Sequence, residues 1–385
     1  MTTEYAPGTP SWLRARNQRI GLTLLLEQGP LTRNQISSLS GLSRPTTNLI
    51  VSHLEEIGLV QAIGEISGGR GPYATNYAVR TQTVLAVAVD IDGRRVRSMV
   101  VDAVGTDYPV AHGMLSDTPE ADASVIDVSA AIGRAAAAAG LDPASVRYVL
   151  VGVQGAVDTK TDEIKYVSNL EPWPTTGLRA HLESHLRMSV TIENDVNLAA
   201  VAERAEGVGA GQESFALLWL SDGLGLALDL NGVIHRGAAG GAGEIGLLPT
   251  PWNVHADAEN LEELFGSRAL AALAGVDGAD PTERLEAALD GELRADILRT
   301  FARRVAVGIE PVLAIIDPGV LVIGGPVGTL GGEDLAEYVA EELHEHTQWR
   351  QLVRASGIER DPVLRGAKHG LVEQVRQHLL DQVGA

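Results

Sequence analysis

Cysteine is absent from this chain of 385 residues. The absence excludes disulfides, thiolate catalysis and cysteine-ligated zinc, and it fits a reducing compartment, so we expect a cytoplasmic protein. Long apolar runs are missing too, because no stretch of about eighteen apolar residues occurs, and we expect no membrane span. The opening residues lack a basic region followed by an apolar one, so they do not resemble a secretory signal.

Positive charge is scarce, and the formal net charge is −20. The first 80 residues nevertheless hold seven arginines and five glutamates, which gives them +2 and leaves −22 for the remainder. A mildly basic head on an acidic body fits DNA contact by the head alone, because the body would repel phosphates. The alternative is chance variation in charge, since +2 is small.

At 385 residues the chain is long enough for two or three domains. The first stretch with clear helical periodicity, residues 17–28, is stopped by Gly29 and Pro30. Thr32 is placed to cap a short second helix, RNQISSLS, with its hydroxyl. After a turn at Gly41, Ser43 is placed to cap a third helix, which tolerates proline in its first turn.

The third helix has one apolar and one polar face. Spacing predicts a buried stripe made of Thr47, Ile50, Leu54 and Ile57. Small polar groups and one arginine then face outward, a surface that suits base edges in a DNA major groove. The predicted DNA contacts of this helix are Ser43, Arg44, Thr46 and Asn48.

Two alternating segments, 59–66 and 74–80, predict a β-hairpin with the glycine-rich tip 67-SGGRGP-72. Arg70 at this tip would enter a minor groove if the hairpin is a wing, and the alternative is a solvated turn. The order of elements predicts a winged helix-turn-helix domain over residues 12–80. A small helical protein-interaction domain is the alternative for the whole segment.

Residues 81–385 alternate between strand-like and helical stretches, which predicts an α/β architecture. The first two strands are joined closely by 90-DIDGRR-95, so we expect a mixed sheet. About 300 residues suit two lobes with a cleft between them. The strand-like runs are 84–90, 97–103, 147–153, 190–193, 215–220 and 320–324.

Several motifs in this order resemble the ROK family of repressors, open reading frames and kinases. The matching stretches include 152-GVQGAVD-158, 193-ENDVNLAAVAE-203, 236-RGAAGGAGEIGLL-248 and 317-DPGVLVIGGPV-327. The resemblance implies an actin-like body of the sugar kinase and ribonuclease H-like type. Family members that carry the head are usually sugar-responsive transcription factors, and members without it are often sugar kinases.

The chain departs from the family where kinases hold phosphate. The family's first loop, DxGGTK, reads 90-DIDGRR-95, with Asp92 in place of a glycine. Its second loop reads 221-SDGLGLA-227, with Asp222 in place of a hydroxyl residue. Phosphate needs close backbone N–H groups, and carboxylates repel it, so we expect no ATP site, no cofactor and no enzymatic activity. Arg94 and Arg95 lie close enough to offset part of this charge.

The metal site of the family is also changed. Its zinc ligands are a histidine, here Leu247, and a cysteine cluster, here 252-WNVHADAENLEELFG-266. His255 and Asp257 remain in that segment, but a structural zinc needs about four converging ligands, so we predict no metal site there.

The resemblance places sugar contacts at Asn194, Asp195, Glu244 and Glu262. Carboxylates and amides suit vicinal hydroxyls. For the two glutamates the alternative is a plain surface carboxylate, and Asp195 is also placed to cap the helix after it.

We interpret the chain as a DNA-binding regulator, most often a repressor in this family, with operator DNA and a sugar as partners. Paired heads reading a pseudo-palindrome predict a homodimer or homotetramer. One rival is an active sugar kinase with Asp195 as catalytic base. Another is a ligand-blind DNA-binding protein.

Overall fold

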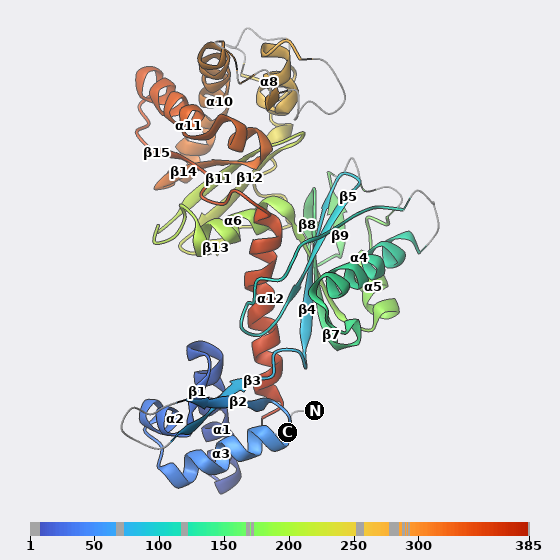
Figure 1. Ribbon diagram of the computed structural model, residues 1–385. Coiled ribbons are helices and arrows are strands. Elements are labelled where there is room, and N and C mark those ends of the chain that lie inside the picture. The colour runs from blue at the N-terminus through green and yellow to red at the C-terminus, as the bar shows by residue number, and fades with distance from the viewer. Residues whose placement is uncertain are drawn as a thin grey trace.

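The computed structural model of this chain describes residues 8–66, 73–116, 122–166, 170, 173–251, 258–276, 285–286, 289, 291 and 293–383. Figure 1 shows a small head at one end, two larger lobes above it, and one long helix, α12, that runs between them. Among the described helices, none is both long enough and apolar enough to cross a membrane.

The head begins with three helices whose starts are fixed by side-chain caps. The Thr32 hydroxyl accepts from the Gln35 N–H at 3.3 Å, and Ser43 caps the third helix, so both predicted starts are confirmed. The first helix begins earlier than residue 17, because Thr9 caps it and Pro10 suits its first turn. The three helices are α1 (Pro10–Gln28), α2 (Arg33–Ser40) and α3 (Arg44–Glu56).

The apolar stripe of α3 is as predicted at Thr47, Ile50 and Leu54, which are buried. The prediction is wrong for Ile57, which is 40% exposed because α3 has ended and Ile57 is its C-cap. The predicted hairpin is present, and β3 pairs antiparallel with β2 and with a short β1. The tip residues 67–72, and with them Arg70, lie outside the described residues. The strands are β1 (Leu31–Thr32), β2 (Val60–Ile66) and β3 (Ala74–Val79).

The first lobe is built on a five-stranded sheet. β4 and β5 are antiparallel, whereas β4, β7 and β10 run parallel, so the predicted mixed sheet is confirmed. In spatial order the strands are β10 (Ser189–Asn194), β7 (Val146–Val153), β4 (Leu85–Asp92), β5 (Arg95–Val101) and β6 (Ala111–Met114). One face packs on α4 (Ala123–Ala139) and α5 (Leu178–Leu186), next to the turn η1 (Pro143–Ser145) and the hairpin β8 (Ala156–Asp158) and β9 (Glu163–Lys165).

The second lobe repeats this plan with another five-stranded sheet. Its order is β13 (Val233–Ile234), β12 (Leu224–Leu230), β11 (Phe215–Leu220), β14 (Val320–Gly324) and β15 (Leu352–Ala355). Helix α6 (Asp195–Glu206) packs on one face of this sheet. The other face packs on α10 (Arg294–Ile316) and α11 (Gly325–His346), with η2 (Ile245–Leu247), α7 (Leu261–Phe265) and α8 (Ser267–Leu273) at its edge.

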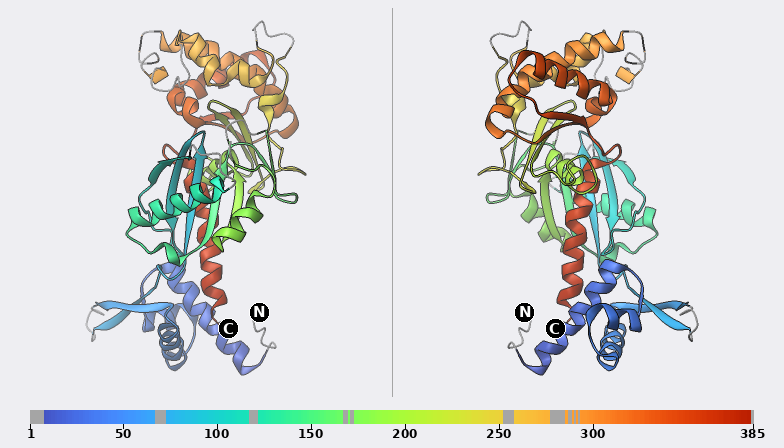
Figure 2. Two further views of the ribbon diagram at one scale, coloured as in Figure 1. Left: turned by 90° about the vertical axis from the view of Figure 1, so that its right-hand side faces the viewer. Right: turned by 90° about the vertical axis from the view of Figure 1, so that its left-hand side faces the viewer.

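Helix α12 (Pro362–Asp381) connects these units, as the side views in Figure 2 make clear. It packs against α6, against the first-lobe sheet and against α1 of the head. One continuous apolar cluster holds Leu22 and Leu25 of α1 together with Leu371, Val375 and Leu379 of α12. The core of the head and the core behind the first-lobe sheet are therefore a single core.

Polar contacts fix the same helix end. Arg19 of α1 pairs with Asp381 at 3.0 Å, and the Arg376 Nε donates to the Ala103 carbonyl at 2.7 Å. The Tyr148 hydroxyl lies 2.8 Å from His378 Nδ1. These contacts hold α12 in one rotational setting, which apolar packing alone specifies less strictly.

Two glycines on α12 give a direct test of this packing. A Cβ added at Gly366 would lie 1.8 Å from the Leu198 carbonyl oxygen in α6, whereas at Gly370 the nearest atom would be 3.9 Å away. We expect Gly366→Ala to lower the free energy of unfolding by about 1–3 kcal/mol through overpacking. Gly370→Ala, the matched control, should raise it by up to about 1 kcal/mol through helix propensity. Urea unfolding that gives both variants the same sign would contradict this packing.

Candidate functional site

The junction of β10 and α6 lies at the cleft between the lobes. Asn194 is the N-cap of α6, since its Oδ1 accepts from the Asn197 N–H at 2.9 Å while its Nδ2 donates to the Gly155 carbonyl at 3.0 Å. Asp195 is the first helical residue, so the expectation that Asp195 caps the helix is wrong. Asn194 takes that role because its backbone is extended and its side chain reaches the next turn.

A buried carboxylate behind this junction holds it in place. Glu193 is 8% exposed and accepts from the Asn194 N–H and the Asn197 side-chain amide, each at 3.0 Å. The Arg236 Nε also donates to the Glu193 carboxylate, at 2.7 Å. Sequence reasoning missed this pair, although an acidic residue that closes a buried strand signals a need for a cation.

All four predicted sugar contacts line one cavity of about 420 Å³, which falls within the usual range of small-molecule sites. Asn194 ends β10 of the first-lobe sheet and Asp195 begins α6, whereas Glu244 precedes η2 and Glu262 belongs to α7. Gly243 lets its loop run against β12, because its φ is 92° and a Cβ there would lie 1.8 Å from the Leu226 carbonyl oxygen. The same cavity is lined by residues that the sequence analysis did not single out, among them Gln154, Tyr166 and Arg268.

Two carboxyl groups of this cavity, those of Asp195 and Glu244, have raised pKa values. Burial, and then the negative charge of Asp90, raise the pKa of Asp195 to about 8. Burial, and then the charge of Glu262, also raise the pKa of Glu244. At neutral pH Asp195 is therefore mostly protonated, and in this form its carboxyl group can donate a hydrogen bond to a hydroxyl. The cavity thus offers both donors and acceptors of hydrogen bonds.

The neighbouring part of the cleft, about 340 Å³, is lined by an ion-pair network. Arg97 of β5 bridges Asp90, at 2.5 Å, and Asp361, at 3.2 Å. Burial raises the pKa of Asp90 to about 6, an effect that Arg97 partly opposes. Six carboxyl groups, that of Asp195 among them, and two arginines line this part of the cleft, and the excess of negative charge disfavours a polyphosphate.

The two acidic residues that replace phosphate-loop positions are both hydrogen-bonded. Asp92 accepts from Gln154 Nε2 at 3.2 Å, and Asp222 accepts from the Ser267 hydroxyl at 2.8 Å. Gly93 keeps a positive φ of 58° in a tight β4–β5 turn, so the first loop is a short hairpin here. These hydrogen bonds hold two carboxylates in the loops that correspond to the phosphate-binding loops of the family's kinases.

The outer face of α3 is largely as expected. Arg44 and Asn48 are exposed, and Thr46 is half-buried. Ser43 is exposed, but its hydroxyl is occupied by capping and lies 2.8 Å from the Thr46 hydroxyl. Leu49, 74% exposed beside Asn48, was missed, although its position outside the buried stripe marks it as a surface residue.

The altered zinc region is only partly described. Leu247, at the family's histidine position, is 59% exposed at the end of η2. His255 and Asp257 lie outside the described residues. Within the described residues, one group of three potential metal ligands is found elsewhere, on the first lobe.

The raised pKa of Asp195 predicts a pH-dependent effect of Asp195→Asn. Folded Asp195 keeps its proton up to pH about 8, whereas an unfolded aspartate releases it near pH about 4. Between these values the wild type loses stability with rising pH, because the unfolded state releases a proton that the folded state retains. The melting-temperature advantage of Asp195→Asn should therefore grow from pH about 5 to about 8 and then level off. An advantage that is constant or shrinks over this range contradicts the assignment, and exposed Asp296→Asn in α10 is the control.

Known proteins resemble this chain in sequence and in fold. The family model described as ROK family matches residues 86–369. A xylose repressor of Bacillus spizizenii is 25% identical over 247 residues, a match that covers 63% of this chain and 62% of that repressor. A ROK family glucokinase from Streptomyces griseus, solved in complex with glucose and AMPPNP, is 26% identical and aligns with a TM-score of 0.62 over 75% of this chain and 99% of its own.

A solved ROK family transcriptional regulator, a homologue of the E. coli MLC protein, aligns over 96% of this chain and 99% of its own with a TM-score of 0.68. At 17% identity this likeness shows the fold alone, and it extends to the residues before the family model begins. The expected two-lobed, sugar-kinase-like body is confirmed. Since the family model covers most of the chain, the protein belongs to the ROK family.

Proposed function

We propose that this chain is a DNA-binding transcriptional repressor whose operator affinity is set by a sugar or sugar derivative bound in a non-catalytic cleft. The observation that carries the proposal is the course of α12. It begins next to Asp361, which is ion-paired to Arg97 in the cleft, and it ends in the core of the head. A ligand that changes the cleft thus has a physical route to the head.

The head supports the DNA-binding part of the proposal. Three helices followed by a hairpin are the order of elements in a winged helix-turn-helix domain. We propose that α3 enters a major groove with Arg44, Thr46 and Asn48 at the base edges and Leu49 against a thymine methyl. We also propose that Arg70 enters the minor groove. Ser43 would act by capping α3 at the DNA surface, because its hydroxyl is already engaged in that cap.

The cleft supports the sensing part. Asn194, Asp195, Glu244 and Glu262 offer amide and carboxyl groups to sugar hydroxyls within one cavity. Xylose, which names the Bacillus spizizenii relative, is the first candidate effector, and glucose is the second. Binding would shift the equilibrium between two arrangements of the lobes, and we propose that α12 transmits this shift to α1.

The rival function is an ATP-dependent sugar kinase. The similar glucokinase favours it, because that enzyme was solved with glucose and AMPPNP in place. The acidic lining of the neighbouring part of the cleft weighs against it, because carboxylates repel phosphate. A homodimer that places two heads on a pseudo-palindromic operator completes our proposal.

The DNA proposal is tested on α3. We expect Arg44→Ala to weaken binding to an operator selected from genomic DNA by about 1–3 kcal/mol, which is roughly 5- to 150-fold. Arg303→Ala, an exposed arginine of α10, is the control and should leave affinity unchanged. Fluorescence anisotropy at fixed salt measures both. Equal effects of the two substitutions, or a selection that yields no preferred fragment, would remove the basis for this role.

The sugar proposal is tested by calorimetry with D-xylose and D-glucose, followed by a wider sugar panel. Glu244→Ala and Asn194→Ala should each weaken sugar binding by about 1–3 kcal/mol, because each leaves a sugar hydroxyl without its hydrogen-bond partner. Incubation with ATP and Mg²⁺ should yield no sugar phosphate. Sugar phosphorylation that Asp195→Asn abolishes would establish the kinase instead, and a panel without any binder would favour a ligand-blind DNA-binding protein.

A further inference from the structure

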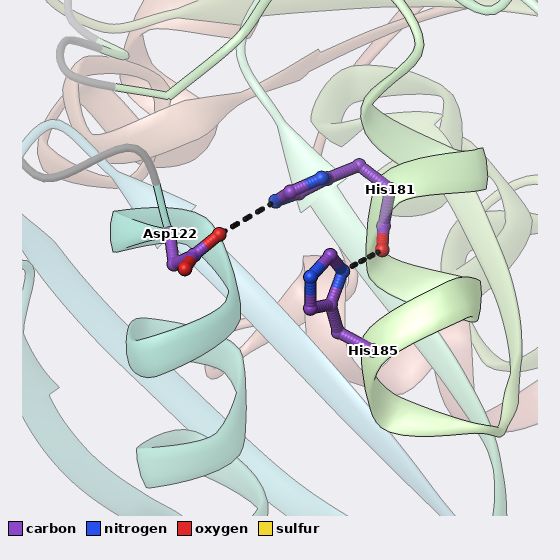
Figure 3. A group of neighbouring side chains, drawn as sticks. All are labelled: Asp122, His181 and His185. Carbon is purple, nitrogen blue, oxygen red and sulfur yellow. Dashed lines mark hydrogen bonds and ion pairs between the residues drawn. The ribbon is translucent and has the colours of Figure 1, made fainter.

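The outer face of the first lobe carries a group of side chains that neither DNA binding nor the cleft uses. Asp122 lies at the start of α4, and His181 and His185 lie on α5. One potential ligand atom from each residue lies within 4.8 Å of the others. Figure 3 shows the Asp122 carboxylate facing the His181 ring, with the His185 ring close by on the same helix. From this geometry we infer a binding site for a divalent transition-metal ion such as Zn²⁺.

The spacing on α5 favours chelation. Residues four apart lie on the same helix face, so His181 and His185 present their rings together. The two ring centroids are 4.4 Å apart. Two imidazoles at this spacing bind borderline metals such as Zn²⁺, Co²⁺ and Ni²⁺, whereas Ca²⁺ and Mg²⁺ prefer oxygen ligands alone.

The hydrogen bond of His185 leaves its Nε2 atom available for a metal ion. His185 Nδ1 lies 2.9 Å from the His181 carbonyl oxygen. A carbonyl only accepts, so this contact assigns the proton to Nδ1 and leaves a lone pair on Nε2. Metal-ligating histidines usually donate their second ring N–H to such a carbonyl, which fixes the tautomer and the ring orientation.

The other two side chains lack the partners that their positions normally provide. His181 is 28% exposed in its side chain, yet its Nε2 atom is buried and makes no hydrogen bond. Its nearest counterpart is the Asp122 carboxylate at 3.6 Å, which is a long contact. Asp122 occupies the N-cap of α4 without capping it, because its side chain accepts no backbone N–H there. A metal ion would satisfy both groups at once.

Small changes in side-chain torsions would bring the three ligand atoms to the spacing that a metal ion requires. Donor atoms around a tetrahedral Zn²⁺ are about 3.4 Å apart for bonds near 2.1 Å, so the 4.8 Å spread closes through changes in side-chain torsions. Three protein ligands leave a fourth position for water. The bound ion would join the start of α4 to α5 on the lobe surface, so it should stabilise the first lobe.

The test uses the full chain after treatment with EDTA. Calorimetry with ZnCl₂ should show one ion per chain, and Co²⁺ should give the visible absorption of a low-coordinate site. His181→Gln and His185→Gln should each weaken Zn²⁺ at least 10-fold and abolish the rise in melting temperature that Zn²⁺ causes in the wild type. His346→Gln is the matched control. This exposed histidine of α11 also lies near a carboxylate, Glu342 at 3.4 Å, but among the described residues it belongs to no group of three potential metal ligands.

The outcomes are decisive because His185 is exposed and the Nε2 atom of the half-buried His181 makes no hydrogen bond, so without metal both variants should melt as the wild type does. No saturable binding at Zn²⁺ on the order of 100 µM, about 5.5 kcal/mol at 298 K, would overturn the inference. Binding that persists unchanged in both α5 variants would also overturn it, because the ion would then lie elsewhere. The site does not depend on the proposed regulatory function, and neither result bears on DNA or sugar binding.

Discussion

The packing of α12 is the constraint on which the rest of this structure depends. The helix supplies apolar side chains to the first-lobe sheet, to α6 and to α1, so one core belongs to the body and the head together. A head attached only by a flexible segment would keep its orientation independent of the cleft. Here any rotation of α12 must repack the core of the head, because packed interfaces change between discrete arrangements more readily than they deform.

Charged side chains line one part of the cleft and disfavour a polyphosphate there. The Arg97 bridge ties β5 to Asp361 at the start of α12, so the ion pair in the neighbouring part of the cleft also anchors the helix. A kinase needs this region open and attractive to phosphate. Burying carboxyl groups in it costs free energy, which protonation of Asp195 reduces. The cavity therefore keeps the amide and carboxyl groups that we propose for sugar binding, while an ion-pair network lines the space beside it.

Local features were predictable from the sequence, whereas long-range partners were not. The caps at Thr32 and Ser43 depend on neighbours three residues away, and those helix starts were predicted correctly. The choice between Asn194 and Asp195 as cap depends on one residue's backbone angles, which composition does not specify. The Glu193–Arg236 and Arg97–Asp361 pairs join residues far apart in the chain, and only the fold brings them together. The four predicted sugar contacts came from family resemblance and not from periodicity; they line one cavity, and sugar binding by them stays a prediction.

The most direct test of this account is thermodynamic linkage between the cleft and the head. Affinity for the selected operator is measured without sugar and with D-xylose or D-glucose at a concentration that calorimetry shows to fill the cleft. The account predicts a change of roughly 5- to 150-fold, and DNA should change the sugar affinity by the same factor. An operator affinity that stays the same while the cleft is filled would contradict the claim that α12 couples the two sites.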